Sequence, residues 1–352
     1  MRMRKIGIKL SCFMGMALWL SACAAPLPAP LPRLEEAQTG AKKEVSPGLI
    51  PQEYLCAGGL QEAPDPHLVQ EIQAFLEENG MLGGVPSGLA SDLPMVLNGP
   101  VKAYLRVFTT SHKVVFASYL ARSGRYLPLM LRIFREHGLP EDLVYLCLVE
   151  SGFNPWAKSP AEAVGPWQFI KDTAQRYGLR VNGWVDERRD PEKSTRAAAH
   201  YLKDLYRQFG CWYLAAAGYN AGEKRVEGTL NRNNTHDFWE LAQRRLLPQE
   251  TCNYVPQLIA AALIAKNPEK HGFQGISYQS PWRAVRVKVP GGVDIRWFAE
   301  ALAIPFETLR ELNPELLKDR TPGDCQEYLL QIPTRDRSLA NIVAQICWKE
   351  KN

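Results

Sequence analysis

The chain has 352 residues, of which 46% are hydrophobic and 22% are charged, and its formal net charge is +5. This length is sufficient for one large domain or two, with a substantial buried core. Residues 1–22 contain four basic residues and no acidic residue, so subtracting them from +5 leaves +1. A near-neutral chain gives no reason to expect nucleic acid as a partner.

The start of the chain has the features of an export signal. A basic segment precedes the apolar run from Leu10 to Leu20, which is too short for a transmembrane helix. Leu20-Ser21-Ala22-Cys23 is typical of a bacterial lipoprotein signal, so we expect removal of residues 1–22 and lipidation of Cys23. An uncleaved anchor is the alternative. No aspartate follows Cys23, and resemblance to Gram-negative lipoproteins then implies the periplasmic side of the outer membrane.

The next part of the chain is predicted to be a tether followed by helices. Residues 23–60 are rich in Pro, Ala and charge, which favours an extended linker from the lipid. Helices are expected after Asp65-Pro66 and from Asn98-Gly99-Pro100 onward, where capping residues precede periodic apolar positions. We expect Ser123-Gly124 to end one helical run and Tyr126 to Glu136 to form the next.

Helical patterns also dominate the middle of the chain. Further helices are predicted at Phe169 to Tyr177, Glu192 to Phe209, Trp212 to Tyr219 and from Pro248 through Leu263. Pro256 is expected to bend the last of these, because proline removes a helical hydrogen bond. The body of the protein is therefore predicted to be helical.

The tail has a different pattern. Val285 to Val289 alternates as a strand, Ile295 to Leu302 and Phe306 to Leu312 read as short helices, and Tyr328 to Pro333 reads as a second strand. This strand–helix–helix–strand order resembles a degenerate LysM glycan-binding module. The alternative is an appendage that only packs on the helical body.

One predicted helix leads directly to a carboxylate. Pro140 can occupy the first helical position and Gly152 can end the helix. The seven apolar residues from Leu143 to Val149 predict that this helix is buried. Glu150 shares a face with them, and burial raises the pKa of a carboxyl group, as a general acid near neutral pH requires. The alternative is a helix-end glutamate turned to solvent.

Four blocks follow this helix, and together with Glu150 they resemble the soluble lytic transglycosylase (SLT) family of peptidoglycan-cleaving enzymes. The blocks are Ser159, Val164 to Ile170, Ala217 to Gly222 and Glu250 to Pro256. The resemblance implies a mainly α fold without a cofactor. Its expected parts are a lysozyme-like helical transglycosylase domain over residues 138–275, a helical extension over 61–137 packed on it, and a small βααβ LysM-like unit over 280–335.

The resemblance implies a reaction on glycan strands that uses one glutamate. Glu150 would protonate the oxygen between N-acetylmuramic acid and N-acetylglucosamine, then accept the proton of the muramic C6 hydroxyl as a 1,6-anhydro ring closes. Most glycosidases use two carboxylates. The candidates for a second one are Glu162, Asp186, Asp190 and Glu250, and none lies in a block that the family marks as a nucleophile. A hydrolytic muramidase and a non-catalytic peptidoglycan-binding scaffold are the alternatives.

The blocks nearest to Glu150 are expected to recognise the sugar substituents. By resemblance, Ser159 and Gln168 would form hydrogen bonds to the N-acetyl or lactyl groups, and such polar groups give specificity because leaving them unpaired is costly. The family's usual Gly-Leu-Met-Gln is Gly165-Pro166-Trp167-Gln168 here. We expect Trp167 to alter the floor of the cleft.

The later blocks are expected to form the facing wall. The resemblance places Tyr219 and Asn220 there, with the Tyr219 hydroxyl near Glu150. Glu250 and Tyr254 lie one helical turn apart and would face the cleft together. The alternative for these two is a surface or core pair.

Cysteine and histidine patterns add no further site. After loss of Cys12 and lipidation of Cys23, six cysteines remain, and their number permits disulfides without deciding their pairing. Cys147 lies in the apolar helix and reads as a small buried hydrophobe. The six histidines show no paired metal spacing, so we expect no metal site. The oligomeric state is left open.

Overall fold

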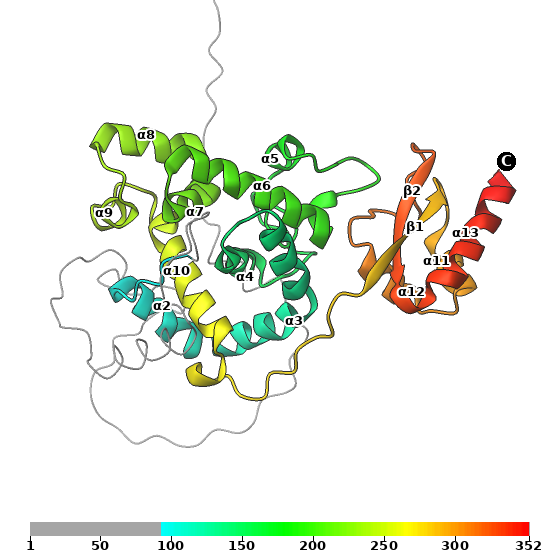
Figure 1. Ribbon diagram of the computed structural model, residues 1–352, viewed down its shortest axis with the longest axis horizontal. Coiled ribbons are helices and arrows are strands. Elements are labelled where there is room, and N and C mark those ends of the chain that lie inside the picture. Colours follow the sequence, from blue (N-terminus) through cyan, green and yellow to red (C-terminus); the bar gives the residue numbers. More distant parts are fainter. Residues whose placement is uncertain (1–92, 352) are drawn as a thin grey trace, which may run out of the picture.

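The computed structural model describes residues 93–351, which form a helical body and a smaller C-terminal unit (Figure 1). One hydrophobic core extends from Leu93 to Phe273, and a second is built mainly from residues 285–347. The predicted mainly α class is confirmed. The expected lipidation site Cys23, the tether and the helix after Asp65 lie outside the described residues.

Most predicted helices of the body are present. Asn98 caps the first through a hydrogen bond to the Val101 N–H, and Asp190 caps α6 through the N–H groups of Glu192 and Lys193. The elements are α2 (Gly99–Thr109), α3 (Lys113–Glu136), η3 (Glu141–Val144), α4 (Tyr145–Ser151), α5 (Lys171–Arg176), η4 (Glu187–Arg189), α6 (Pro191–Phe209), α7 (Trp212–Ala221), α8 (Glu223–Asn233), α9 (Phe238–Gln243), α10 (Gln249–Lys266) and η5 (Glu269–His271). Helices α8 and α9 were not predicted.

The predicted break at Ser123-Gly124 is wrong, because α3 runs through it as one helix of 24 residues. The Ser123 hydroxyl is buried and bonds back to the Leu120 carbonyl within the helix. Gly124 serves close packing, since a Cβ there would lie 2.6 Å from the Gln279 carbonyl oxygen. These two residues therefore mark a contact surface rather than a helix end.

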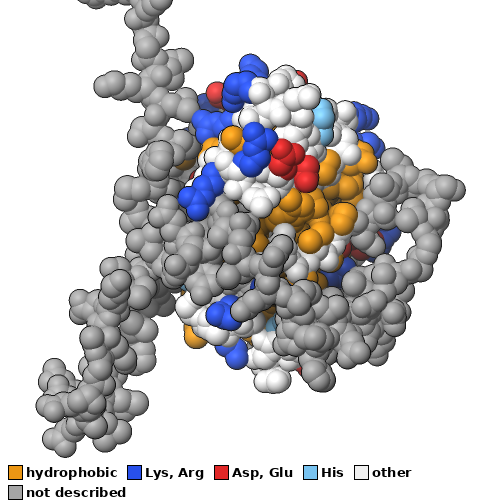
Figure 2. Space-filling model, turned by 90° about the vertical axis from the view of Figure 1, so that its left-hand side faces the viewer, with side chains coloured by type: hydrophobic (Ala, Val, Ile, Leu, Met, Phe, Trp, Pro, Cys, Tyr) orange, Lys and Arg blue, Asp and Glu red, His pale blue; other side chains and the backbone are white. Residues whose placement is uncertain are grey.

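Helix α4 lies in the middle of the body, with α3, α6, α7 and α10 around it (Figure 1). Small residues allow this packing: a Cβ on Gly218 of α7 would lie 2.8 Å from the Phe209 ring of α6. On the face away from the C-terminal unit, hydrophobic side chains gather in one area flanked by acidic and basic ones (Figure 2).

The C-terminal unit has the predicted strand–helix–helix–strand order. Strand β1 (Ala284–Pro290) pairs antiparallel with β2 (Glu327–Pro333), and α11 (Ile295–Ala301) and α12 (Phe306–Leu312) lie between them in the chain. Its likeness to a LysM module stays a prediction.

A further helix follows the second strand. After η6 (Thr334–Asp336), helix α13 (Arg337–Lys351) packs on β1 and was not predicted. Its buried residues Ala340, Val343, Ala344 and Cys347 have helical spacing, so the periodicity was readable in the sequence. The unit thus extends beyond the residue 335 expected as its end.

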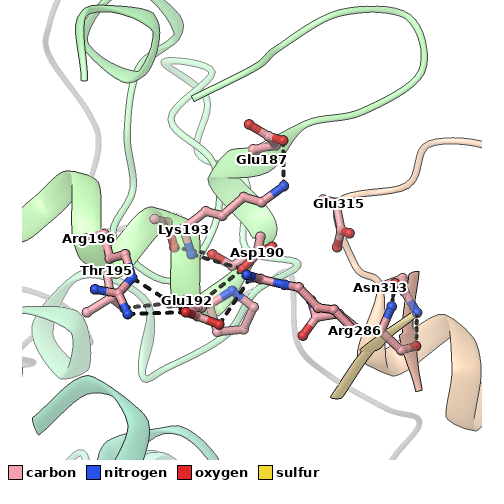
Figure 3. Close-up of polar contacts among 12 residues, drawn as sticks. Glu187, Asp190, Glu192, Lys193, Thr195, Arg196, Arg286, Asn313 and Glu315 are labelled. Carbon is pink, nitrogen blue, oxygen red and sulfur yellow. Dashed lines mark hydrogen bonds and ion pairs between the residues drawn. The ribbon is translucent and has the colours of Figure 1, made fainter. Parts of the chain in front are cut away.

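The two units are joined at the start of α6. The Val185 side chain belongs to the core of the C-terminal unit, and the backbone N–H of Asp186 donates to the Glu315 carbonyl at 2.8 Å. Arg286 reaches from β1 to Glu192 on α6, at 3.0 Å (Figure 3). A second contact lies on α3, where Gln279 N–H donates to the Ala121 carbonyl at 2.8 Å.

Candidate active site

Glu150 is the penultimate residue of α4, and the end of this helix is held in place from two sides. Gly152 ends the helix at φ 58°, and a Cβ there would lie 2.2 Å from the Tyr119 ring, so no larger residue fits. The Ser151 hydroxyl donates to the Pro166 carbonyl at 2.7 Å. These contacts fix the backbone on which the Glu150 side chain is mounted.

The Glu150 carboxyl is half-buried and has one hydrogen-bond donor from another helix. The Tyr254 hydroxyl on α10 donates to Glu150 Oε1 at 2.5 Å. Burial raises the pKa of Glu150 to about 8, the Tyr254 hydrogen bond opposes this rise, and the charge of Glu250 adds to it. Glu150 therefore holds a proton at neutral pH and can donate it.

Tyr219 lies close to this carboxylate but bonds elsewhere. Its hydroxyl donates to the Trp167 carbonyl at 2.8 Å, and its ring contacts Phe169 and Tyr201. Burial raises the Tyr219 pKa well above its ordinary value, and the charge of Glu150 contributes to that rise. The residue that donates to Glu150 is thus Tyr254, whereas Tyr219 holds the neighbouring loop.

That loop has a conformation which its sequence requires. Gly165 has φ 86°, and a Cβ there would lie 1.9 Å from the Arg188 carbonyl oxygen. Gln168 also has a positive φ, and its Nε2 donates to the carbonyls of Gly165 at 2.7 Å and Ala157 at 3.3 Å. Its Oε1 is shielded from solvent without a hydrogen-bond partner among the described residues. Gln168 therefore has one unused acceptor.

The expectation that Trp167 shapes the cleft floor is wrong, because its side chain is completely buried. The indole stacks on Phe134 at 5.4 Å, and its N–H donates to the Thr195 hydroxyl at 2.8 Å. With a ring partner and a hydrogen-bond acceptor inside the core, the indole has a stable place there. Trp167 contributes to the site only through its backbone carbonyl.

Ser159 shapes the segment before this loop. Its hydroxyl accepts from the Ala163 N–H at 3.0 Å, and its own N–H donates to the Ala163 carbonyl at 2.9 Å. These bonds close a turn that pairs Lys158 with Val164. The described structure gives Ser159 no hydrogen bond to Glu150 or Gln168, although its hydroxyl proton is still available to a ligand.

Asn220 joins the two helices that face Glu150. Its Nδ2 donates to Glu250 Oε1 at 3.3 Å, and its Oδ1 accepts from the Thr251 hydroxyl at 2.8 Å. Glu250 is exposed at the start of α10, and Tyr254 is buried one turn later. The fold therefore brings Glu150, Tyr219, Asn220, Glu250 and Tyr254 together.

A buried arginine that the sequence reasoning missed fastens the loop from behind. Arg188 forms an ion pair with Asp186 at 2.8 Å and donates to the carbonyls of Phe169 at 3.0 Å and Glu162 at 2.9 Å. The spacing of Asp186 and Arg188 in the sequence was the available signal. Because one guanidinium serves three acceptors, it fixes the backbone next to Gln168.

The other candidates for a second carboxylate have partners of their own. Asp186 is held by Arg188, Asp190 caps α6, and Glu162 is exposed and paired with Lys158 at 2.8 Å. Glu250 is the candidate whose charge acts on Glu150. The arrangement thus offers one protonated carboxyl group with an exposed acidic neighbour.

Three further features complete the description of residues 93–351. No disulfide joins any two of the five cysteines in this part. No group of three or more His, Cys, Asp or Glu side chains in it could hold a metal ion. None of the helices described here has the length and apolar character needed to cross a membrane.

Comparison with known proteins gives several matches to transglycosylases. Residues 134–242 match the family model for the transglycosylase SLT domain. Over 237 residues the chain is 32% identical to membrane-bound lytic murein transglycosylase D of Escherichia coli (strain K12), covering 66% of this chain and 50% of that protein. It is 34% identical over 145 residues to peptidoglycan transglycosylase gp16 of Escherichia phage T7, covering 40% of this chain and 10% of that one.

Among solved structures, the 70 kDa soluble lytic transglycosylase SLT70 of Escherichia coli matches with a TM-score of 0.37 and 25% identity, covering 44% of this chain and 26% of that one. The chain spans about half the length of the lytic murein transglycosylases D that it matches. The family match begins in α3 and includes Glu150, the Gln168 loop and Tyr219. In this helical domain, the chain is therefore similar to the transglycosylase SLT family.

Proposed function

We propose that this protein is a lytic transglycosylase that cleaves the β-1,4 bond between N-acetylmuramic acid and N-acetylglucosamine in peptidoglycan. The observation that supports this most is the protonated, half-buried Glu150 held by Tyr254 within an SLT domain. The matched relatives from Escherichia coli and phage T7 are named as murein or peptidoglycan transglycosylases, which supports the same substrate.

In the proposed reaction, Glu150 acts first as an acid and then as a base. Its proton passes to the bridging oxygen as the bond from that oxygen to the muramic C1 breaks. The C6 hydroxyl of the same sugar then attacks C1, and its proton returns to Glu150. The product ends in a 1,6-anhydro ring, no water is consumed, and the carboxyl group is regenerated.

The surrounding residues would position this carboxyl group and the sugar. Tyr254 orients Glu150 through its hydroxyl, and Asn220 with Glu250 forms the rim on α7 and α10. The unused Oε1 of Gln168 can accept from the N–H of an N-acetyl group, and the Ser159 hydroxyl can donate to a carbonyl or lactyl oxygen. Both residues are held on a loop that Arg188 stabilises.

We also propose that Cys23 is lipidated and that the enzyme works on the periplasmic side of the outer membrane. The basic start, the apolar run and Leu20-Ser21-Ala22-Cys23 support this, and the relative from Escherichia coli is named as membrane-bound. Replacing Cys23 by Ala should release the protein from the membrane fraction without changing its cleavage of isolated sacculi.

Mass spectrometry of digested sacculi tests the reaction. The wild-type protein should release muropeptides that are one water lighter than hydrolysed products, and Glu250→Gln should release the same anhydro products. A hydrolytic muramidase that used Glu250 as its second carboxylate would give the heavier products and lose them in Glu250→Gln. A binding scaffold would sediment with sacculi and release no soluble product.

A further inference from the structure

A hollow of about 150 Å³ lies where α3, the loop after Glu150 and the C-terminal unit meet. It is lined by side chains from α3, from the Asn154–Trp156 loop, from the linker before β1 and from α12. The residues used below are Arg122 and Arg125 on α3, Asn154 and Trp156 in the loop, and Glu311 on α12. Because its lining residues come from both units, neither unit forms this hollow alone.

The hollow is rich in guanidinium groups. Arg122 donates to the Gly152 carbonyl at 2.6 Å but has no carboxylate partner among the described residues, and Arg125 pairs with Glu311 at 2.8 Å. Two more guanidinium groups flank Trp156, from Arg189 at 5.5 Å and Arg310 at 5.3 Å from the ring centroid. Two guanidinium groups therefore line the hollow with one carboxylate, and two more lie near the Trp156 ring at its edge.

Two of these guanidinium groups, Arg189 and Arg310, repel each other, and Arg189 has a spare donor. Burial lowers the pKa of Arg189, and the neighbouring charge of Arg310 lowers it further, although Asp186 partly compensates. Arg189 Nε is shielded from solvent and has no partner among the described residues. An anion bound beside Trp156 would relieve the repulsion and satisfy this donor.

The hollow lies near the proposed reaction centre. Asn154 lines it and is only four residues after Glu150, so their Cα atoms are at most about 14 Å apart. The Asn154 Oδ1 accepts from the Trp156 N–H at 3.0 Å, and the amide Nδ2 has no partner in the described structure. A fully extended peptide of about four residues is also about 14 Å long, so a peptide of that length could reach from Glu150 to Asn154.

We propose that this hollow binds the carboxylates of the peptide stem carried by the N-acetylmuramic acid that Glu150 attacks. The inference rests on the proposed function, which supplies the glycan. The stem is attached to the lactyl group of that sugar and ends in free carboxylates, which match planar guanidinium groups. The C-terminal unit would then contribute to recognition through Arg310, rather than only pack on the body, while Glu311 would weaken binding by repulsion.

Direct binding tests this with the Glu150→Gln protein, which separates binding from catalysis. The probes are a disaccharide-tetrapeptide muropeptide and the same muropeptide with its carboxyl groups converted to amides. We expect the natural muropeptide to bind more tightly. Arg189→Gln should weaken its binding about tenfold, the loss of one charge-assisted contact of about 1.4 kcal/mol. The same substitution should leave binding of the amidated probe unchanged.

Two matched variants sharpen the test. Glu311→Gln removes the only carboxylate that lines the hollow in the described structure and should tighten binding of the natural muropeptide. Arg244→Gln, an exposed arginine on the surface after α9, should have no effect. Equal losses for both probes, or no change in Arg189→Gln, would overturn the proposal.

A third arm identifies the source of the anion. Vesicles of anionic phospholipid should bind the wild-type and Arg189→Gln proteins equally, and selective loss of vesicle binding would point to lipid and overturn the proposal. The outcome is independent of catalysis. If the wild-type protein cleaved no glycan but the muropeptide results held, the proposed function would fail while the peptide site stood. Glycan cleavage without the expected charge dependence of binding would instead support the proposed function and overturn the peptide site.

Discussion

Two glutamate–tyrosine pairs in this molecule have similar chemistry and different surroundings. Glu150 accepts from Tyr254 at 2.5 Å in the body, and Glu315 accepts from Tyr328 at 2.6 Å at the junction with the C-terminal unit. Burial raises the pKa of both carboxyl groups, to about 8 and about 7 respectively. A raised pKa alone thus does not distinguish a catalytic acid from a structural one.

The difference lies in access. Glu150 is half-buried and stands beside the exposed Glu250, whereas Glu315 is only 1% exposed and is enclosed by Tyr328 and the buried Asp190. A proton held by Glu150 can reach a ligand, but one held by Glu315 can only affect how the two units fit together. The following substitutions test whether this distinction holds.

The largest expected effect is on catalysis. Glu150→Gln should lower the release of muropeptides from sacculi about 10³-fold, because general acid catalysis typically contributes 10²–10⁴-fold. Glu315→Gln makes the same chemical change at the buried position and should stay within about twofold of the wild-type rate. Comparable losses in the two variants, measured on folded proteins, would mean that access does not separate the pairs.

Removing the tyrosine hydroxyls should also affect the rate at one pair only, though less strongly than removing the carboxyl group. Tyr254→Phe removes the hydroxyl that orients Glu150 and stabilises the carboxylate formed as its proton leaves, so the rate should fall about 10- to 100-fold. Because that bond lowers the pKa of Glu150, its loss should move the alkaline limb of the pH–rate profile to higher pH. Tyr328→Phe should change neither quantity. A limb that moved to lower pH in Tyr254→Phe would contradict this assignment.

Much of the frame around Glu150 could be predicted because its signals are local. Gly152 ends the helix, Asn98 and Asp190 cap two others, and the apolar run before Glu150 marks a buried helix. Each signal acts within one helical turn, where backbone geometry and capping chemistry decide the outcome. The alternation in β1 was readable for the same reason.

The contacts that define the site could not be predicted, because they join residues far apart in the sequence. Tyr254 is 104 positions from Glu150, and no local pattern indicates which tyrosine will meet the carboxylate. Trp167 looked like a cleft residue from its motif, but the ring of Phe134 and the Thr195 hydroxyl hold it in the core. The spacing of Asp186 and Arg188 could have indicated their ion pair, but not the loop carbonyls that Arg188 also binds, because a sequence does not show backbone acceptors.

The buried Glu315–Tyr328 pair should affect stability instead of rate. Glu315 has its folded-state pKa raised from 4.5 to about 7, so the folded protein keeps a proton that the unfolded chain releases. Its contribution to the free energy of unfolding should therefore fall as pH rises from about 4.5 to 7 and stay level above that. Glu315→Gln should raise the free energy of unfolding by about 3 kcal/mol at pH 8 and leave it unchanged near pH 4.

Denaturant unfolding at the two pH values measures this, with Glu300→Gln as the control. Glu300 is exposed on α11 of the same unit, so its replacement should have no effect at either pH. A stability gain in Glu315→Gln that was equal at pH 4 and pH 8 would show that improved packing, and not the proton, is responsible.

The smallest expected effect comes from the exposed acidic neighbour of Glu150, whereas Asp190, the acidic neighbour of Glu315, is buried. Glu250 raises the pKa of Glu150 through its charge, so Glu250→Gln should lower that pKa and move the alkaline limb of the rate profile down by about 0.5 pH unit. Because Glu250 is exposed, the shift should shrink at high salt. The exposed Glu227 on α8 is the matched control, and Glu227→Gln should leave the limb in place. If Glu250→Gln kept the wild-type limb at low salt, the charge of Glu250 would not reach Glu150, and burial together with Tyr254 would alone set its protonation.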